Sequence, residues 1–142
     1  MAELPTGIAL EVATPLGKEL SVETESVQVP SAAGQFGVLA GHVPLLAALK
    51  PGILTYKQEG KQLRAAVGGG YAEAGAGRVR LITEFFMRPE DVDLEDAQKD
   101  RAAAEAHLKE LKATTEEVAY RDAERALQWA EARIELAGSA SN

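Results

Sequence analysis

Glycine and proline are distributed unevenly along this 142-residue chain, and that distribution restricts what it can fold into. Twelve of the 13 glycines and five of the six prolines lie in residues 1–87, whereas residues 90–137 contain neither. Both residue types mark turns and interrupt helices. We therefore expect short elements joined by turns in the first segment and long helices in the second. The boundary between two domains is placed near Arg88, which gives domains of residues 1–87 and 88–142.

Residues 1–87 show the alternation of apolar and polar residues that indicates strands with one buried face. The alternating stretches are residues 8–12, 20–29, 53–57, 63–67 and 79–83. Turn-forming clusters separate them, at residues 14–17, 30–34, 50–52 and 75–77. Short strands interrupted at such intervals predict an antiparallel β-sandwich or flattened barrel. No long helical pattern lies between them, so parallel βαβ units are not expected.

Residues 88–142 carry two stripes of small and apolar residues at helical spacing. The stripes run over residues 94–111 and 119–137. Asp91 and Asp93 stand where a helix N-cap is expected, and Thr114 with Glu117 matches the capping box of a second helix. The short connection predicts an antiparallel pair. The expected fold is thus an N-terminal antiparallel β-sandwich followed by a C-terminal two-helix hairpin.

Alanine dominates both helical stripes. Small side chains let two helices approach closely, but each buries little apolar area. The hairpin should therefore be only marginally stable by itself. Two interpretations remain open from the residues alone: the hairpin detaches from the rest of the chain, or it is permanently docked.

Charge divides at the same boundary. The net charge is −7 and the isoelectric point about 4.9, of which residues 1–87 carry −1 and residues 88–142 carry −6. An acidic chain of this kind is not expected to bind nucleic acid. The absence of cysteine excludes disulfides, thiol catalysis and cysteine-ligated zinc. No apolar run approaches the roughly 20 residues of a membrane span, and the N-terminus does not resemble a signal peptide. We expect a soluble protein of a reducing compartment.

The residues that carry chemistry elsewhere do not form a site in this sequence. Gly68, Gly69 and Gly70 are not followed by the Lys and Ser/Thr of a phosphate loop, so a bend between strands is the better interpretation. His42 and His107 lie in different domains, without the neighbours of a triad or metal site. No catalytic or metal-binding residue is predicted.

An ordered set of motifs resembles the epsilon subunit of bacterial F-type ATP synthases, which is similar to the chloroplast epsilon and mitochondrial delta subunits. The motifs are Gly34-Gln35-Phe36-Gly37, Gly41-His42-Val43-Pro44-Leu45, Leu49-Lys50-Pro51-Gly52, residues 67–73 and residues 90–93. The resemblance covers about residues 6–136, with the motifs in the family's order. Each motif is weak alone, but the ordered set is specific.

The resemblance implies a non-catalytic central-stalk subunit without a cofactor. Such a subunit binds the gamma subunit and the c-ring through its sandwich and couples the one to the other. Its hairpin lies folded on the sandwich or extends to the alpha and beta subunits of the catalytic head, where it inhibits ATP hydrolysis. The implied location is the cytoplasmic face of the bacterial inner membrane, where the complex holds the subunit peripherally.

The resemblance also assigns roles to residues of the first domain. Gly34 and Gln35 match the turn that faces the c-ring, at a position where the family often has an acid. His42 matches the family histidine near the gamma contact.

Some relatives bind ATP as a regulatory ligand at the base of the hairpin, through an Ile/Leu-Asp-x-x-Arg-Ala motif. The matching residues here are Val92, Asp93, Asp96 and Ala97, so an acid replaces the arginine. Asp122 likewise stands where a basic residue is expected. An acid repels phosphate, so ATP binding is predicted to be weak or absent.

Arg121, Arg125 and Arg133 are the residues that the resemblance assigns to contact with the acidic catalytic head. We expect inhibition to persist if these arginines share a face of their helix. Three rival interpretations are considered: a non-enzymatic β-sandwich adaptor with a helical arm outside any rotary complex, an enzyme with a site at the glycine-rich turns, and a nucleotide sensor.

Overall fold

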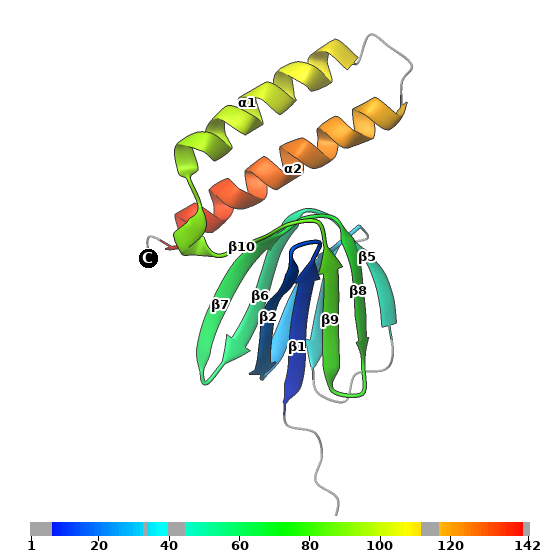
Figure 1. Ribbon diagram of the computed structural model, residues 1–142, viewed down its shortest axis with the longest axis vertical. Coiled ribbons are helices and arrows are strands. Elements are labelled where there is room, and N and C mark those ends of the chain that lie inside the picture. Colours follow the sequence, from blue (N-terminus) through cyan, green and yellow to red (C-terminus); the bar gives the residue numbers. More distant parts are fainter. Residues whose placement is uncertain (1–6, 33, 40–44, 112–116, 141–142) are drawn as a thin grey trace, which may run out of the picture.

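The computed structural model describes residues 7–32, 34–39, 45–111 and 117–140. The strands are β1 (Ile8–Thr14), β2 (Gly17–Thr24), β3 (Ser26–Ser31), β4 (Gly34–Leu39), β5 (Leu45–Leu49), β6 (Gly52–Gln58), β7 (Lys61–Val67), β8 (Gly70–Gly75), β9 (Arg78–Thr83) and β10 (Phe86–Met87). A short 3-10 helix η1 (Pro89–Asp91) leads to α1 (Leu94–Leu111) and α2 (Glu117–Ala140). The β-sandwich followed by two helices confirms the predicted fold class (Figure 1).

One sheet forms both layers of the sandwich. Its strand order is β10-β7-β6-β3-β5-β8-β9-β1-β2, with β4 paired to β3. At the fold between the layers, β3 meets β5 through a single described residue pair, Ser31 with Leu49. The core lies between the layers and is built from aliphatic side chains such as Leu10, Leu54 and Leu81, none more than 1% exposed. Aliphatic burial of this kind is the main stabilising term in a small domain.

Two details of the sheet differ from the sequence-based expectation. The alternating stretch 20–29 is two strands, because the chain bends at Glu25 between β2 and β3. Glu25 holds this corner: its amide donates to the Lys57 carbonyl at 2.7 Å, and its carboxylate accepts from the Gly60 amide at 3.0 Å. The second detail is that β1 and β9 pair in parallel. Strands β2 to β8 separate them in the chain, so this parallel pair needs no crossover helix.

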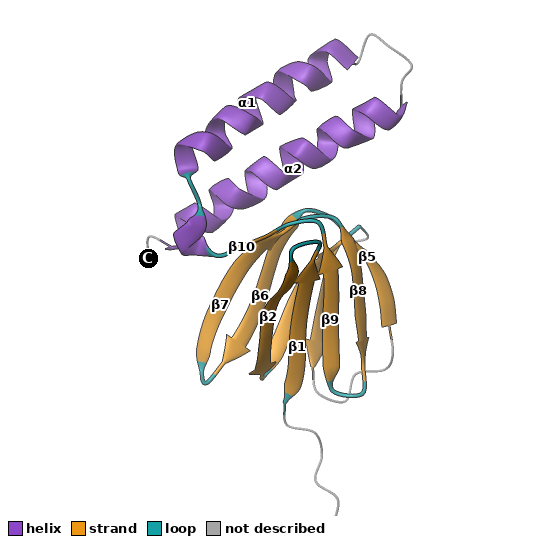
Figure 2. Ribbon diagram, viewed as in Figure 1, coloured by secondary structure: helices purple, strands orange, loops and turns teal. Residues whose placement is uncertain are grey.

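The hairpin lies across one end of the sandwich, with α2 between α1 and the sheets (Figure 2). Leu136 of α2 is fully buried and packs in a cluster with Ala132 and Ala66 of β7. Partly buried residues complete this cluster, namely Ile53, Met87, Val92 and Trp129. Alanines Ala97, Ala104, Ala123 and Ala130 are buried on the two helices, as the helical stripes predicted.

The helix ends match the sequence signals where the structure describes them. The Asp93 carboxylate accepts a hydrogen bond from the Asp96 amide at 3.1 Å, which confirms an N-cap for α1. Asp91 instead lies in η1. The predicted capping residue Thr114 lies outside the described residues, and Glu117 is the first described residue of α2.

We expect Gly70→Ala to destabilise the fold by about 3 kcal/mol or more, measured by chemical denaturation. Gly70 has φ +148°, and a Cβ there would lie 1.9 Å from the Ile82 carbonyl oxygen of the neighbouring strand. Gly17→Ala is the matched control, because Gly17 also has positive φ (+122°) but open space around it. The control should cost only about 1 kcal/mol. Equal losses for the two variants would contradict the steric argument.

Candidate functional site

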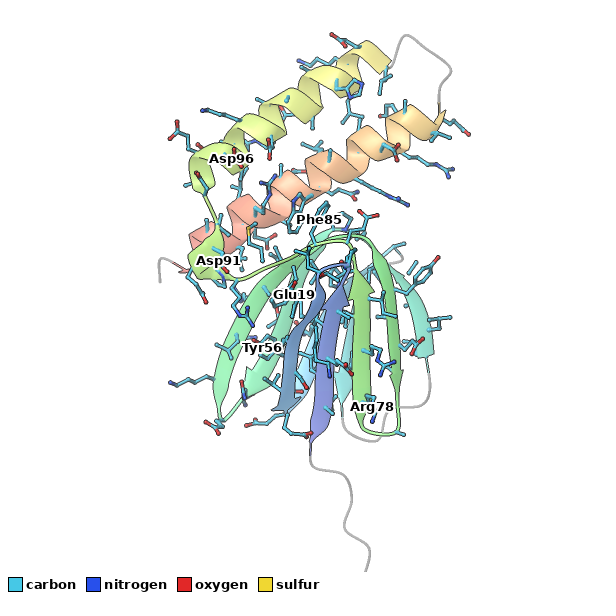
Figure 3. The ribbon with its side chains drawn as sticks, viewed as in Figure 1. Glu19, Tyr56, Arg78, Phe85, Asp91 and Asp96 are labelled. Atoms are coloured by element: carbon cyan, nitrogen blue, oxygen red, sulfur yellow. The ribbon has the colours of Figure 1, made fainter. Side chains whose placement is uncertain are left out.

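A cavity of about 560 Å³ lies where the hairpin meets the end of the sandwich. Both helices and the turns at Pro51, Gly69 and Phe85 line it. Figure 3 shows Phe85 at the end of the sandwich, beneath α2, and Asp96 near the start of α1. The cavity thus lies at the contact through which the hairpin is held.

Arg133 is the charged residue of α2 that is buried at this contact, with 7% of its surface exposed. One terminal nitrogen donates to the Asp100 carboxylate of α1 at 2.8 Å, and the other lies 3.9 Å from Asp96. The Arg133 Nε also donates to the Trp129 carbonyl at 3.4 Å. A desolvated guanidinium needs such partners. Arg133 therefore joins the two helices by charge.

Trp129 joins the hairpin to the sandwich. Its ring stacks on Phe85 with a centroid distance of 5.1 Å and an interplanar angle of 23°. The Arg133 guanidinium lies over the same indole ring, 5.4 Å from its centroid. Aromatic stacking and cation–π contact each add about 0.5–1.5 kcal/mol beyond the buried area. A continuous chain of contacts thus runs from Asp100 through Arg133 and Trp129 to Phe85.

The junction between the domains has its own anchor, Arg88. Its guanidinium lies over the Phe86 ring at 5.2 Å and donates to the Glu19 carbonyl at 2.9 Å. Burial raises the pKa of the nearby Tyr56 hydroxyl, and the charge of Arg88 opposes part of that rise. These contacts tie the chain to the beginning of β2 just before the helices begin.

The structure spreads the four residues of the ATP motif over different tasks. Val92 packs in the Leu136 cluster, Asp93 caps α1, and Ala97 is buried between the helices. Asp96 faces Arg133. Within the described residues no group of three or more His, Asp or Glu side chains is placed to hold a metal ion. Asp96 and Asp100 thus place carboxylates beside the Arg133 guanidinium.

The three arginines assigned to the catalytic head are not equivalent. Arg121 and Arg125 are exposed and line a second cavity of about 230 Å³, together with Lys50 and Ala32 of the sandwich. Arg133 is buried and does not line that cavity. Of the three arginines, Arg125 is the one that lines both cavities. Sequence reasoning missed the approach of Lys50, because only the docking of α2 brings it near the arginines.

The predicted c-ring turn lies at the hairpin end of the sandwich. Gly34 begins β4, pairs with Ser31, and has φ +120°. Its carbonyl accepts a hydrogen bond from the Ser31 hydroxyl. Gln35 follows in β4, opposite Pro30. His42, the predicted gamma contact, lies outside the described residues.

An apolar row on the outer face of the sandwich was not predicted. Tyr71 of β8 pairs with Ala48 of β5 on one side and with Ile82 of β9 on the other. Tyr71 is 60% and Ile82 49% exposed. Ala13 of β1 pairs with Ile82 and extends the row. The alternation in β9 could have indicated Ile82, but only the register places it beside Tyr71.

The chain is similar to ATP synthase proteins over almost its whole length. The family model for the ATP synthase delta/epsilon chain, beta-sandwich domain, matches residues 7–89. The ATP synthase epsilon chain of Nitratidesulfovibrio vulgaris is 40% identical over 92% of this chain and 96% of its own length. That of Geobacter sulfurreducens is 38% identical over 94% and 96%.

Solved structures agree. A chain of the Euglena gracilis mitochondrial ATP synthase superposes with a TM-score of 0.77 and 26% identity, over 99% of this chain and 84% of that one. A chain of the Tetrahymena thermophila mitochondrial ATP synthase shares the fold, with a TM-score of 0.52 and 11% identity, over 95% and 96%.

These similarities confirm the resemblance stated from the motifs, and with it a non-catalytic subunit of the central stalk of an F-type ATP synthase. They do not favour an adaptor outside any rotary complex or an enzyme at the glycine-rich turns. The relatives from Nitratidesulfovibrio vulgaris and Geobacter sulfurreducens are ATP synthase epsilon chains, and this chain belongs to the ATP synthase delta/epsilon family.

Proposed function

We propose that this chain couples the c-ring to the gamma subunit as part of the central stalk, and that its hairpin regulates ATP hydrolysis. The observation that carries the coupling role is the exposed apolar row on β5, β8, β9 and β1. An apolar row of this kind on a small subunit marks a face that a partner covers. Family membership supplies the partner class, because the relatives are ATP synthase chains.

We assign this row to the gamma subunit. Leu46 of β5 is 67% exposed and lies four residues after His42, the residue that matches the family's gamma contact. Leu46 and Ala48, the residue of β5 that belongs to the apolar row, therefore follow the predicted gamma contact closely along the chain. The c-ring contact is assigned to the turn that begins β4 at Gly34 and Gln35, next to the end of β3.

The double substitution Tyr71→Asp with Ile82→Asp is expected to weaken gamma binding by about 30-fold or more, which corresponds to about 2 kcal/mol. Charged side chains at the centre of an apolar contact lose hydration without gaining a partner. Binding of the full chain to purified gamma subunit, measured by surface plasmon resonance, checks this expectation.

Leu63→Asp on β7 is the matched control, because Leu63 is an exposed leucine (38%) on a strand of the other layer. It should leave gamma affinity unchanged. If both substitutions weakened binding equally, or if neither did, the assignment of the apolar row would be wrong.

The regulatory role is supported by how the hairpin is docked. Its contact with the sandwich depends on the small cluster around Leu136 and on the Trp129–Phe85 stack. The helix–helix contact is built largely from alanine. A hairpin that changes between a docked and an extended conformation needs the two to differ by only a few kcal/mol. A docking contact of this small size is consistent with that requirement. The exposed Arg121 and Arg125 supply positive charge for acidic segments of the alpha and beta subunits.

Deletion of residues 88–142 is expected to raise ATP hydrolysis by the assembled complex by about fivefold or more, a coupling free energy of at least about 1 kcal/mol. Proton-driven synthesis should persist, because the proposed gamma and c-ring contacts lie in the sandwich.

Arg121→Gln with Arg125→Gln should release part of the inhibition. Arg101→Gln, an exposed arginine of α1 paired with Glu105, is its control. No rise in hydrolysis after the deletion would contradict an inhibitory hairpin.

ATP is expected not to bind the isolated chain at sub-millimolar concentration in isothermal titration. Asp96 faces Arg133, and Asp100 and Asp122 line the large cavity. These carboxylates repel the triphosphate and neutralise the cation that it would need. Asp96→Arg should increase the affinity for ATP. Sub-millimolar binding by the unaltered chain would overturn the prediction.

As a subunit of the ATP synthase, the chain is associated with a membrane through the complex. None of the helices in the described part of the chain is both long and apolar enough to cross a membrane. We place the subunit at the cytoplasmic face of a bacterial inner membrane, as its bacterial relatives suggest.

A further inference from the structure

The two contacts of α2 differ in the side chains that they bury. Toward α1, the contact contains small residues. Of the 18 residues of α1, Ala97 and Ala104 are buried. Toward the sandwich, α2 buries Leu136 completely and stacks Trp129 on Phe85. A buried leucine or stacked aromatic pair contributes more transfer free energy than alanine does. By apolar burial alone, α1 is the more weakly held element.

Charge compensates for this weakness at one place. Asp96 and Asp100 are four residues apart, so they lie on the same face of α1, and both approach the Arg133 guanidinium. The Arg133 side chain is only 8% exposed, whereas those of Asp96 and Asp100 are 64% and 52% exposed. When α1 is in place, Arg133 is covered and neutralised. When α1 leaves, the guanidinium returns to water.

We propose that Arg133, Asp96 and Asp100 form a charge latch that holds α1 on α2, and that the hairpin opens first at this seam while α2 stays on the sandwich. The inference deepens the proposed hairpin regulation and rests on it. It makes Arg133 a positioning residue in the docked state, whose charge becomes available to an acidic partner only after α1 has separated.

The cysteine-free sequence permits a direct test on the isolated full chain. Ala106→Cys on α1 and Glu124→Cys on α2 replace exposed residues and carry two nitroxide labels. Pulsed electron paramagnetic resonance then measures the distribution of distances between the helices. Trp129 is the chain's single tryptophan, so the quenching of its fluorescence by acrylamide reports separately whether α2 is still stacked on Phe85.

Asp100→Asn should increase the population of separated helices by about tenfold, because it removes a charge-assisted hydrogen bond to a buried guanidinium. Glu105→Gln is the matched control. It also removes one negative charge from α1, but its carboxylate pairs with Arg101 within the same helix at 3.6 Å. The control should leave the distance distribution unchanged. Trp129 quenching should stay at the native level in Glu105→Gln. In Asp100→Asn it should rise less than in Phe85→Ala, because α1 uncovers one side of the cavity while the stack on Phe85 is kept.

Three results would overturn the proposal. An unchanged distance distribution in Asp100→Asn shows that no latch exists. An equal change in Glu105→Gln shows a general effect of charge. Helix separation together with Trp129 quenching as strong as in Phe85→Ala shows that α2 leaves the sandwich as well. If Asp100→Asn lost helical circular dichroism, Asp96→Asn would supply the same test. Because hydrolysis is not measured, these results are independent of whether deleting the hairpin relieves inhibition.

Discussion

The contact of α2 with the end of the sandwich is the interaction on which the arrangement of the two domains depends. Leu136 is fully buried against Ala66, and the Trp129–Phe85 stack lies beside it. Two features of the hairpin follow from this placement: the large cavity, and the approach of Lys50 to Arg121 and Arg125. Because the contact involves few large side chains, it orders the helices without making their docking irreversible.

Acidity has a structural use in this hairpin. By the resemblance, Asp96 takes the position of an arginine in the ATP-binding motif of some relatives, and in the structure its carboxylate faces the guanidinium of Arg133. The proposed weak ATP binding and the observed counter-ion for Arg133 therefore involve the same residue. Asp100 adds the shorter of the two contacts. Electrostatic attraction between the helices thus takes part of the role that a larger apolar seam would otherwise have.

Much of the fold was predictable because it depends on local patterns. The absence of glycine and proline between residues 90 and 137 allowed two long helices, and alternation in residues 1–87 indicated strands. The bend at Glu25 was missed, because apolar alternation continues through it and the hydrogen bonds that turn the chain come from Lys57 and Gly60 of another hairpin. The exposed row at Tyr71 and Ile82 was missed because it depends on register between strands.

The sequence by itself determined the two-part architecture, the negative charge of the hairpin and, through ordered motifs, the resemblance to the ATP synthase family. These properties depend only on the composition and on the spacing of residues along the chain, so they can be read before any tertiary contact is known. Only the tertiary structure decided which charges meet. Arg133 looks like Arg121 and Arg125 in the sequence, yet it alone of the three is buried and paired. Its partners lie more than 30 residues away, and the antiparallel packing of α1 on α2 brings them together.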